Sequence, residues 1–415
     1  MRLLGRYLRR FLKVGSIGII DADDALHSFG RVPPGDQPDV VVALRDRSLY
    51  WKLATRPSLY LGEAYMDGSL EITRGTLRDL LELCCRNLAE RRTARPGIVM
   101  RTLIRVAPYA TLRNTRRRAR SNASHHYDLP NELYRSFLDR GMQYSCAYFP
   151  NLESTLQEAQ DAKKRHLAAK LLLQKNQRVL DIGCGWGGLA IDLACRAGVR
   201  VDGITLSREQ LAFAARQANA AGVEDVHFSY KDYREIDGCY DRIVSVGMFE
   251  HVGVPHYRAF FRKLHDLLAT DGIAVVHSIG SSDGPGFGNP WIRKHIFPGG
   301  HIPALSEVLP AVESSGLVVT DIEILRLHYA ETLRSWGERF LANWESVKHI
   351  YDDRFRRMWE FYLASGEMAF RHGGLMVFQL QLARQQDAVP LTRDYIFEFE
   401  RKRSASSDGV RECAA

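Results

Sequence analysis

The residues best suited to hold a nucleotide-like ligand lie in the segment 178–188, where a short apolar run meets four glycines within six positions. The run predicts a β-strand that carries one carboxylate, Asp181, and the residues after the glycines predict the start of a helix. Glycine has no side chain to keep the backbone away from a ligand at such a turn. Gly183, Gly185 and Gly188 also fit the dinucleotide spacing G-x-G-x-x-G. The segment therefore predicts a site for either an NAD-type or an adenosyl ligand.

The next predicted strand, residues 199–205, helps to choose between these ligands. A dinucleotide enzyme places a carboxylate at the end of this strand to bind the ribose. The nearest carboxylate, Asp202, lies inside the strand, and Thr205, Ser207 and Gln210 follow at its end. This arrangement favours the adenosyl ligand.

Three further segments carry a family resemblance: Gln-Tyr-Ser-Cys-Ala-Tyr at 143–148, Lys-Asp-Tyr-Arg at 231–234, and residues 240–253. Together with the glycine segment and in this order, they resemble the cyclopropane fatty acid synthase and mycolic acid cyclopropane synthase family of S-adenosylmethionine-dependent methyltransferases. The resemblance covers about residues 122–383. Residues 59–72 look like the N-terminal domain signature of long-form members.

The resemblance implies a binding site for S-adenosylmethionine at the glycine turn and at the ends of the following strands. Asp232 can accept a hydrogen bond from the adenine amino group, and carboxylates near a sulfonium moderate its positive charge. The implied cofactor-binding residues are Tyr144, Ser145, Asp181, Gly183, Gly185, Thr205, Ser207, Gln210, Asp232 and Tyr233.

Methylation of an unactivated double bond makes a carbocation, which must lose a proton before a ring can close. The resemblance implies that a bound bicarbonate takes this proton at a site made of Cys146, Glu250, His277, Ile279 and Tyr329. His277 and Tyr329 can donate to an oxyanion, and Glu250 can accept from the bicarbonate hydroxyl. Taken singly, these residues also fit ordinary buried structural roles.

No metal site is predicted. His251 and His256 are five residues apart, which does not fit the helical i, i+4 spacing of a zinc-binding pair.

Composition and charge place the chain among ordinary globular proteins of two domains. It has 415 residues, 45% of them hydrophobic and 26% charged. Residues 1–121 hold 23 Lys and Arg against 12 Asp and Glu, a net charge of +11, whereas the remainder holds 34 against 37. The basic front half predicts an anionic partner, either nucleic acid or a phospholipid surface. The resemblance implies the phospholipid surface, and no base-reading motif supports nucleic acid.

The chain is predicted to form an N-terminal lipid-associated α+β domain at 1–90, a basic linker at 91–121, a catalytic domain at 122–400 and a disordered tail at 401–415. Residues 1–13 predict a basic amphipathic helix that either lies on anionic lipid or packs on its own domain. A transit peptide is a third interpretation. The linker is either a solvated connector or a contact with membrane phosphates.

The catalytic domain is predicted to be α/β, with the Rossmann-like sheet of a class I methyltransferase. Strands are expected at 178–182, 199–205, 226–230, 240–246 and 273–279, and residues 317–327 and 375–382 resemble the antiparallel pair that closes such sheets. Between this pair, an aromatic-rich helical insert at about 332–370 is interpreted as helical core, as the wall of an acyl-chain channel, or as both.

The leading hypothesis is a cyclopropane-fatty-acyl-phospholipid synthase that uses S-adenosylmethionine and bicarbonate. One alternative is a methyltransferase that makes methyl-branched lipids or methylates another small molecule, and a second is a non-catalytic lipid-binding protein. Scattered cysteines predict a reduced, cytoplasmic compartment. The resemblance adds peripheral attachment to the inner face of the membrane and a homodimer.

Overall fold

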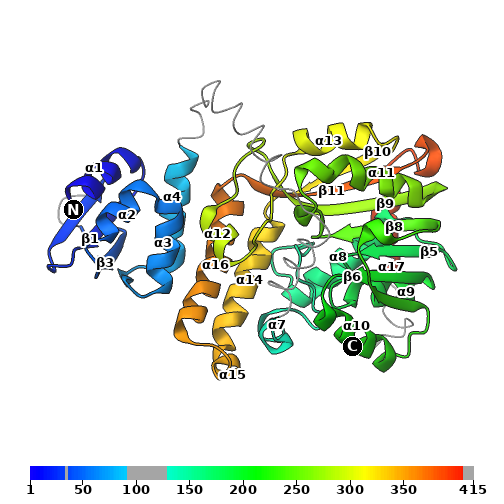
Figure 1. The fold of residues 1–415 in the computed structure, drawn as a ribbon, viewed down its shortest axis with the longest axis horizontal. Helices are drawn as coiled ribbons and strands as arrows, with labels where there is room; N and C mark the ends of the chain where they lie inside the picture. Colours follow the sequence, from blue (N-terminus) through cyan, green and yellow to red (C-terminus); the bar gives the residue numbers. More distant parts are fainter. Residues whose placement is uncertain (33–35, 91–128, 405–415) are drawn as a thin grey trace. The chain divides into compact units, whose positions relative to one another are not determined.

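The computed structural model describes residues 1–32, 36–90 and 129–404 of the chain (Figure 1). The chain divides into two compact units that are not continuous in sequence. The first joins the N-terminal segment to Gly288–Pro298 and Leu333–Leu375, and the second contains the remaining described residues.

These units differ from the predicted division into an N-terminal domain at 1–90 and a catalytic domain at 122–400, because two segments of the predicted catalytic domain pack with the N-terminal one. The predicted basic linker, residues 91–121, lies outside the described residues.

The first unit contains a four-stranded sheet of order β2-β1-β3-β4. β1 pairs antiparallel with β2 and parallel with β3, and β3 pairs antiparallel with β4. The strands are β1 (Ser16–Ile20), β2 (Leu26–Gly30), β3 (Val40–Leu44) and β4 (Leu70–Arg74), and the helices of this segment are α1 (Arg2–Phe11), α2 (Leu49–Thr55), α3 (Pro57–Met66) and α4 (Leu77–Ala89). A mixed sheet with helices confirms the predicted α+β character.

Helix α1 packs on its own domain. Leu4, Leu8 and Phe11 are buried in one apolar core with β1 and β3, whereas the basic face, with Arg2 and Arg6, is exposed. The apolar face is therefore not available to enter lipid, and the interpretation as a helix packed on its own domain is confirmed. The basic face remains able to contact anions.

The helical insert completes the first unit. It consists of α14 (His328–Ala342), which begins in the second unit, α15 (Trp344–Val347) and α16 (Asp353–His372), and it is joined by α12 (Pro290–His295). The ring of Phe361 lies 4.7 Å from that of Trp291 and 6.1 Å from that of Tyr65. The indole Nε1 of Trp291 donates to the sulfur of Met66. These aromatic side chains form helical core, as one interpretation of the insert predicts, and the acyl-channel interpretation stays a prediction.

Gly62 of α3 offers a test of this packing. A Cβ there would lie 2.5 Å from Trp291 Nε1 and 2.7 Å from Phe361 Cε1. We expect Gly62→Ala to lower the free energy of unfolding by about 1–3 kcal/mol, because the rings must move to admit the methyl group. Urea denaturation measures this change.

Gly337→Ala in α14 is the matched control. Its Cβ would lie 3.5 Å from the Arg78 guanidinium, which is an ordinary contact, and alanine favours both helices equally. Equal stability of the two variants would contradict the packing of α3 on α12 and α16.

The second unit is built on a seven-stranded sheet of order β10-β11-β9-β8-β5-β6-β7. The five strands from β9 to β7 run parallel, and β10 pairs antiparallel with β11. The strands are β5 (Arg178–Ile182), β6 (Arg200–Thr205), β7 (Val226–Tyr230), β8 (Tyr240–Val246), β9 (Leu268–Ser281), β10 (Val318–Leu325) and β11 (Leu375–Ala383). This sheet confirms the predicted methyltransferase fold and its closing antiparallel pair.

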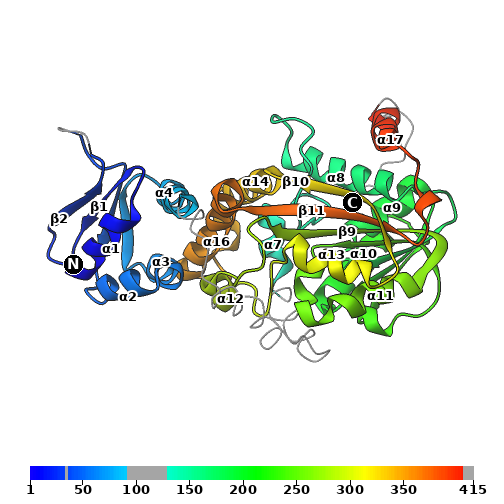
Figure 2. The same ribbon diagram turned by 90° about the horizontal axis from the view of Figure 1, so that it is seen from above.

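Helices cover both faces of this sheet (Figure 2). Side chains alternate along a strand, so Val179 packs toward α8 and α9, and its neighbour Leu180 packs toward α11 and α13. The helices of this unit are α7 (Asn131–Phe137), α8 (Leu156–Lys170), α9 (Gly188–Ala197), α10 (Arg208–Ala220), α11 (Tyr257–Leu267), α13 (Leu305–Glu313) and α17 (Asp394–Ser404), with 3₁₀ turns η1 (Tyr233–Glu235), η2 (Phe249–His251), η3 (Val254–His256) and η4 (Gln386–Ala388). In the described part of the chain, no helix is both long and apolar enough to cross a membrane.

The predicted disordered tail begins too early. Residues 401–404 belong to helix α17, and residues 405–415 lie outside the described residues. Ile396 is buried, Phe399 packs on the core beneath α8 and α9, and the Glu400 carboxylate lies 2.8 Å from Nδ1 of His166. These contacts hold the helix to the domain, and the charged composition of the segment concealed them.

Candidate active site

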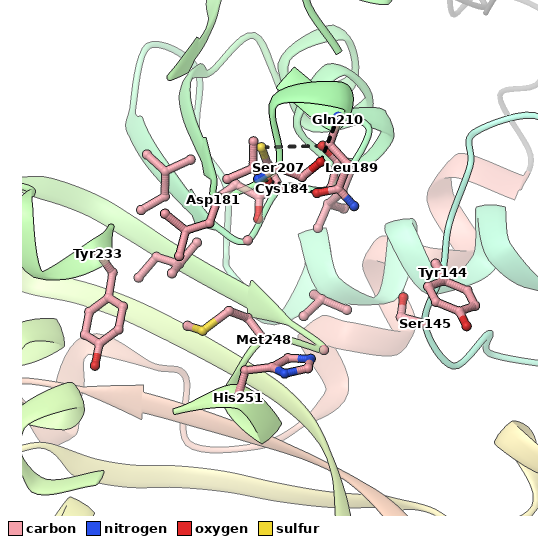
Figure 3. Close-up of a pocket in the computed structure, with 18 of the residues that line it drawn as sticks. Tyr144, Ser145, Asp181, Cys184, Leu189, Ser207, Gln210, Tyr233, Met248 and His251 are labelled. Atoms are coloured by element: carbon pink, nitrogen blue, oxygen red, sulfur yellow. Dashed lines mark hydrogen bonds between the residues drawn. The ribbon is translucent and has the colours of Figure 1, made fainter. Parts of the chain in front are cut away.

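A cleft opens at the carboxyl ends of β5, β6 and β8 in the second unit, where an open parallel sheet is expected to bind its ligand. It encloses about 1290 Å³, counting the space at its open mouth. Figure 3 shows Tyr144 and Ser145 on one side of it and Tyr233 on the other. All ten residues predicted to bind the cofactor line this cleft: Tyr144, Ser145, Asp181, Gly183, Gly185, Thr205, Ser207, Gln210, Asp232 and Tyr233.

The glycine turn after β5 forms the floor of the cleft. Gly183 and Gly185 have φ values of +83° and +56°, which side chains disfavour. A Cβ on Gly185 would meet no atom of the described chain within 4 Å, so it would project into the space of the cleft. A Cβ on Gly188 would lie 2.1 Å from the carbonyl oxygen of Gly141. The glycines therefore give a ligand room and let α9 approach the segment before Tyr144.

Hydrogen bonds after the end of β6 hold the side-chain amide of Gln210 in one orientation. Thr205 Oγ1 donates to Gln210 Oε1 at 2.8 Å, so Gln210 can offer its Nε2 to a ligand. Ser207 Oγ accepts from Gln210 N–H at 3.2 Å and caps α10. Ser207 is thus a helix cap as well as a residue of the cleft wall.

Asp232, after β7, is buried and paired with Arg234, whose Nε lies 2.7 Å from Oδ1. A carboxylate oxygen accepts more than one hydrogen bond, so Asp232 can still face an amino group. The ring of Tyr233 packs edge-on against Phe260, 5.2 Å away. These contacts fix the wall of the cleft opposite Tyr144.

The carboxylate of Asp181 indicates which ligand group the cleft can bind. Its side chain is 1% exposed, and its Oδ2 has no hydrogen-bond partner among the described residues. Burial raises the pKa of Asp181 to about 7, and the positive charge of Lys163 opposes that rise. A buried carboxylate oxygen of this kind needs a donor. The α-amino group of S-adenosylmethionine supplies one, so the residues present fit this cofactor.

Four of the five residues predicted to hold bicarbonate are buried, and Ile279 is half-buried. As the structure describes the cleft, none of the five lines it: Cys146, Glu250, His277, Ile279 and Tyr329. Two of them are in contact, because Ile279 N–H donates to Glu250 Oε1 at 2.7 Å. Glu250 Oε2 has no hydrogen-bond partner among the described residues. Burial raises the pKa of Glu250 to about 7, against the opposing hydrogen bond from Ile279.

His277 lies two residues before Ile279 on β9, and burial holds its pKa well below the usual value. The neutral ring accepts from Gln379 Nε2 at Nδ1, 3.1 Å away, so its proton lies on Nε2 and can be donated. Burial also raises the pKa of the Cys146 thiol, which donates to the Ala147 carbonyl. The bicarbonate role of these residues stays a prediction.

Comparison with known proteins decides the family. A family model for mycolic acid cyclopropane synthetase matches residues 114–380. The chain is 37% identical to the cyclopropane-fatty-acyl-phospholipid synthase of Escherichia coli K12, over 88% of this chain and 92% of that one. The chain belongs to the cyclopropane synthase family. It is accordingly an S-adenosylmethionine-dependent methyltransferase, as predicted.

Other members of the cyclopropane synthase family match shorter parts of the chain. The tuberculostearic acid methyltransferase UfaA1 of Mycobacterium tuberculosis is 39% identical over 66% of this chain and 67% of its own. The crystal structure of the mycolic acid cyclopropane synthase CmaA1 with SAH and CTAB has 33% identity and a TM-score of 0.59, covering 63% of this chain and 97% of that one.

Three residues at or beside the cleft were not predicted. Met248 and His251 line it from the segment after β8 (Figure 3), and burial lowers the pKa of His251 to about 4, so this histidine is neutral. Lys163 lies behind the cleft and is fully buried. Lys163 lies seven residues after Leu156 and four before Leu167, on the buried face of α8. A lysine at a buried helical position is unusual, and this spacing could have identified it as a candidate functional residue.

Gly185→Ala tests whether the glycine turn holds the cofactor. We expect SAH affinity to fall at least about tenfold, since the methyl group occupies ligand space. Isothermal titration calorimetry measures this affinity.

Gly222→Ala is the control, because Gly222 has a similar φ of +63° and no atom within 4 Å in the described chain, yet lies outside the cleft lining. Both variants should lose similar stability, and only Gly185→Ala should lose SAH. Unchanged SAH affinity in Gly185→Ala would remove the cofactor from this turn.

Proposed function

We propose that this protein is a cyclopropane-fatty-acyl-phospholipid synthase, which adds a methylene across cis double bonds of phospholipid acyl chains. The observation that carries the proposal is the cleft, where Asp181 presents an unsatisfied acceptor in a chain 37% identical to such a synthase over 88% of its length. When bound, S-adenosylmethionine supplies a methyl group from its sulfonium. Gain of this methyl group and loss of one proton leave a net addition of CH₂.

The residues of the cleft have separate tasks in this proposal. Asp181 accepts from the cofactor amino group, and the open space at Gly185 admits the chain that joins this group to the ribose. Gln210 offers its amide to the ribose, and Asp232 offers a carboxylate oxygen to the adenine amino group. Held in this way, the reactive methyl group has one orientation toward the alkene.

We propose bicarbonate as the base that removes the proton, held by Cys146, Glu250, His277, Ile279 and Tyr329. Two observations support this site: Nε2–H of His277 is a donor for an oxyanion, and Glu250 Oε2 is a buried acceptor. When ionised, Glu250 accepts from the bicarbonate hydroxyl and makes the anion more basic. A small buried anion also spares the protein's own carboxylates from alkylation by the carbocation.

The proposed substrate surface is an anionic phospholipid membrane, approached from its cytoplasmic side. Support comes from the net charge of +11 over residues 1–121 and from the exposed basic face of α1. A homodimer, in which one subunit holds the membrane while the other reacts, is part of this proposal.

Methyl transfer without ring closure is the second candidate function. Its support is the 39% identity with tuberculostearic acid methyltransferase UfaA1. A non-catalytic lipid-binding protein has less support, because the cleft presents each of the ten predicted cofactor-binding residues.

Incubation with isotopically labelled S-adenosylmethionine and vesicles of unsaturated phospholipid tests the function. We expect label in the lipid, as an acyl product heavier than its substrate by one labelled CH₂ group, which is 14 mass units plus the mass of the retained label, as measured by mass spectrometry. Methyl transfer and proton loss without ring closure give a methyl-branched or exomethylene alkene of the same mass, whose remaining double bond takes up two hydrogens on mild catalytic hydrogenation; this product would support the second candidate. Absence of label from the lipid would contradict both.

The same vesicles test the membrane proposal. We expect more protein to sediment with anionic than with zwitterionic vesicles, and less at 0.5 M than at about 0.1 M salt, because salt screens exposed charges. Salt-independent binding would exclude the basic face as the cause.

Glu250→Gln tests the proposed base site through pH. Because the pKa of Glu250 is raised to about 7, wild-type turnover should rise as pH increases through about 7, where the carboxyl loses its proton and becomes an acceptor. The variant should lose this dependence and about 10²–10⁴-fold in turnover, with SAH affinity retained as the control for folding. An unchanged pH profile in Glu250→Gln would contradict the role of this carboxylate.

A further inference from the structure

Lys163 is a buried cation that the proposed chemistry leaves without a task. It lies on α8 with 0% of its side chain exposed. Its Nζ donates to Ser145 Oγ at 2.7 Å. Burial of an ammonium group is costly, so a lysine kept at this position calls for a compensating role.

The contact with Lys163 sets the direction of the Ser145 hydroxyl. A hydroxyl that accepts from an ammonium group must direct its own proton elsewhere. Ser145 lines the cleft, and its carbonyl oxygen accepts from Gln160 Nε2 at 3.0 Å, which fixes the backbone. Ser145 therefore faces the cleft as a donor, strengthened by the positive charge behind it.

The same ammonium group acts on Asp181. Burial lowers the pKa of Lys163 to about 7, and the charges of Asp139 and Asp181 oppose that fall. In return, Lys163 favours the ionised form of Asp181, whose Oδ2 has no partner among the described residues. Asp139 is held by backbone N–H groups of Gly141 and Gln143. The Lys163 ammonium group thus acts on both a hydrogen-bond donor of the cleft, Ser145, and an acceptor, Asp181.

A ligand matched to Ser145 and Asp181 carries both an anionic and a cationic group. The Ser145 hydroxyl suits a carboxylate, and the Asp181 carboxylate suits an ammonium group. The amino-acid end of S-adenosylmethionine has both groups.

We propose that Lys163 is a positioning residue for the cofactor's amino-acid end, because its hydrogen bond orients the Ser145 hydroxyl toward the α-carboxylate and its charge favours the form of Asp181 that accepts from the α-amino group. The inference deepens the proposed function and rests on its cofactor. It predicts that Lys163 matters for ligands with an amino-acid end and not for the adenosyl part alone.

Calorimetry with two probes tests this proposal on the full chain. SAH carries the amino-acid end, and 5′-methylthioadenosine keeps the nucleoside and sulfur without it. We expect Lys163→Met to weaken SAH roughly 10–100-fold, the range of a lost charge-assisted hydrogen bond, and to leave methylthioadenosine within about twofold. Equal weakening of both probes would overturn the proposal.

Lys164→Met is the matched control. Lys164 is the next residue of α8, is 7% exposed, and pairs with Asp161 and Asp192 at 2.8 Å and 3.4 Å. Loss of this lysine disturbs a buried ion pair without touching Ser145, so SAH affinity should stay near that of wild type. SAH losses of the same size in both variants would reduce Lys163 to a structural role.

Ser145→Ala keeps the test decisive if Lys163→Met does not fold. We expect the same selective loss of SAH, and in the double variant a loss smaller than the product of the single ones, because the two residues act through one hydrogen bond. Full multiplicativity, or no selectivity in Ser145→Ala, would refute the linkage. These assays need no lipid, so a wild type that binds SAH but makes no cyclopropane would contradict the proposed function and leave this inference standing.

Discussion

The chemistry of this protein depends on charge that is buried at the end of one strand. Asp181, the last residue but one of β5, has an oxygen without a hydrogen-bond partner among the described residues, and the charge of Lys163, which is also buried, favours its ionised form. Buried charges of this kind are stable only with partners. The protein supplies some of the hydrogen bonds and opposite charges that these buried groups need, so a bound ligand must supply the others. The cleft is therefore selective for a molecule that brings an ammonium group and a carboxylate.

The fold places those charges by ordinary means. Parallel strands end at one edge of the sheet, and the glycine turn lets α9 begin there without side chains in the way. Thr205 and Ser207 then fix Gln210 by hydrogen bonds within the protein. Folding of the sheet therefore already places the cleft residues in position for the ligand, so the cleft is preorganised.

Local features of the sequence predicted most of the second unit. The parallel strands follow from apolar runs, and the ten cleft residues follow from the glycine turn, the strand ends and a family resemblance. Long-range packing could not be predicted from local sequence patterns. For example, Trp291 and Phe361 pack against α3 because Gly62 has no side chain to keep them away. Lys163 was missed because lysine is expected at the surface. Its place on the apolar stripe of α8 becomes meaningful only beside Ser145.

A crystal structure of the protein with SAH bound would show directly whether Asp181 and Ser145 bind the amino-acid end of the cofactor. We expect the α-amino nitrogen of SAH to lie within hydrogen-bond distance of Asp181 Oδ2, with its carboxylate at Ser145 Oγ and Lys163 Nζ still bonded to that hydroxyl. An amino-acid end directed out of the cleft, with Asp181 paired to another protein group, would contradict this expectation.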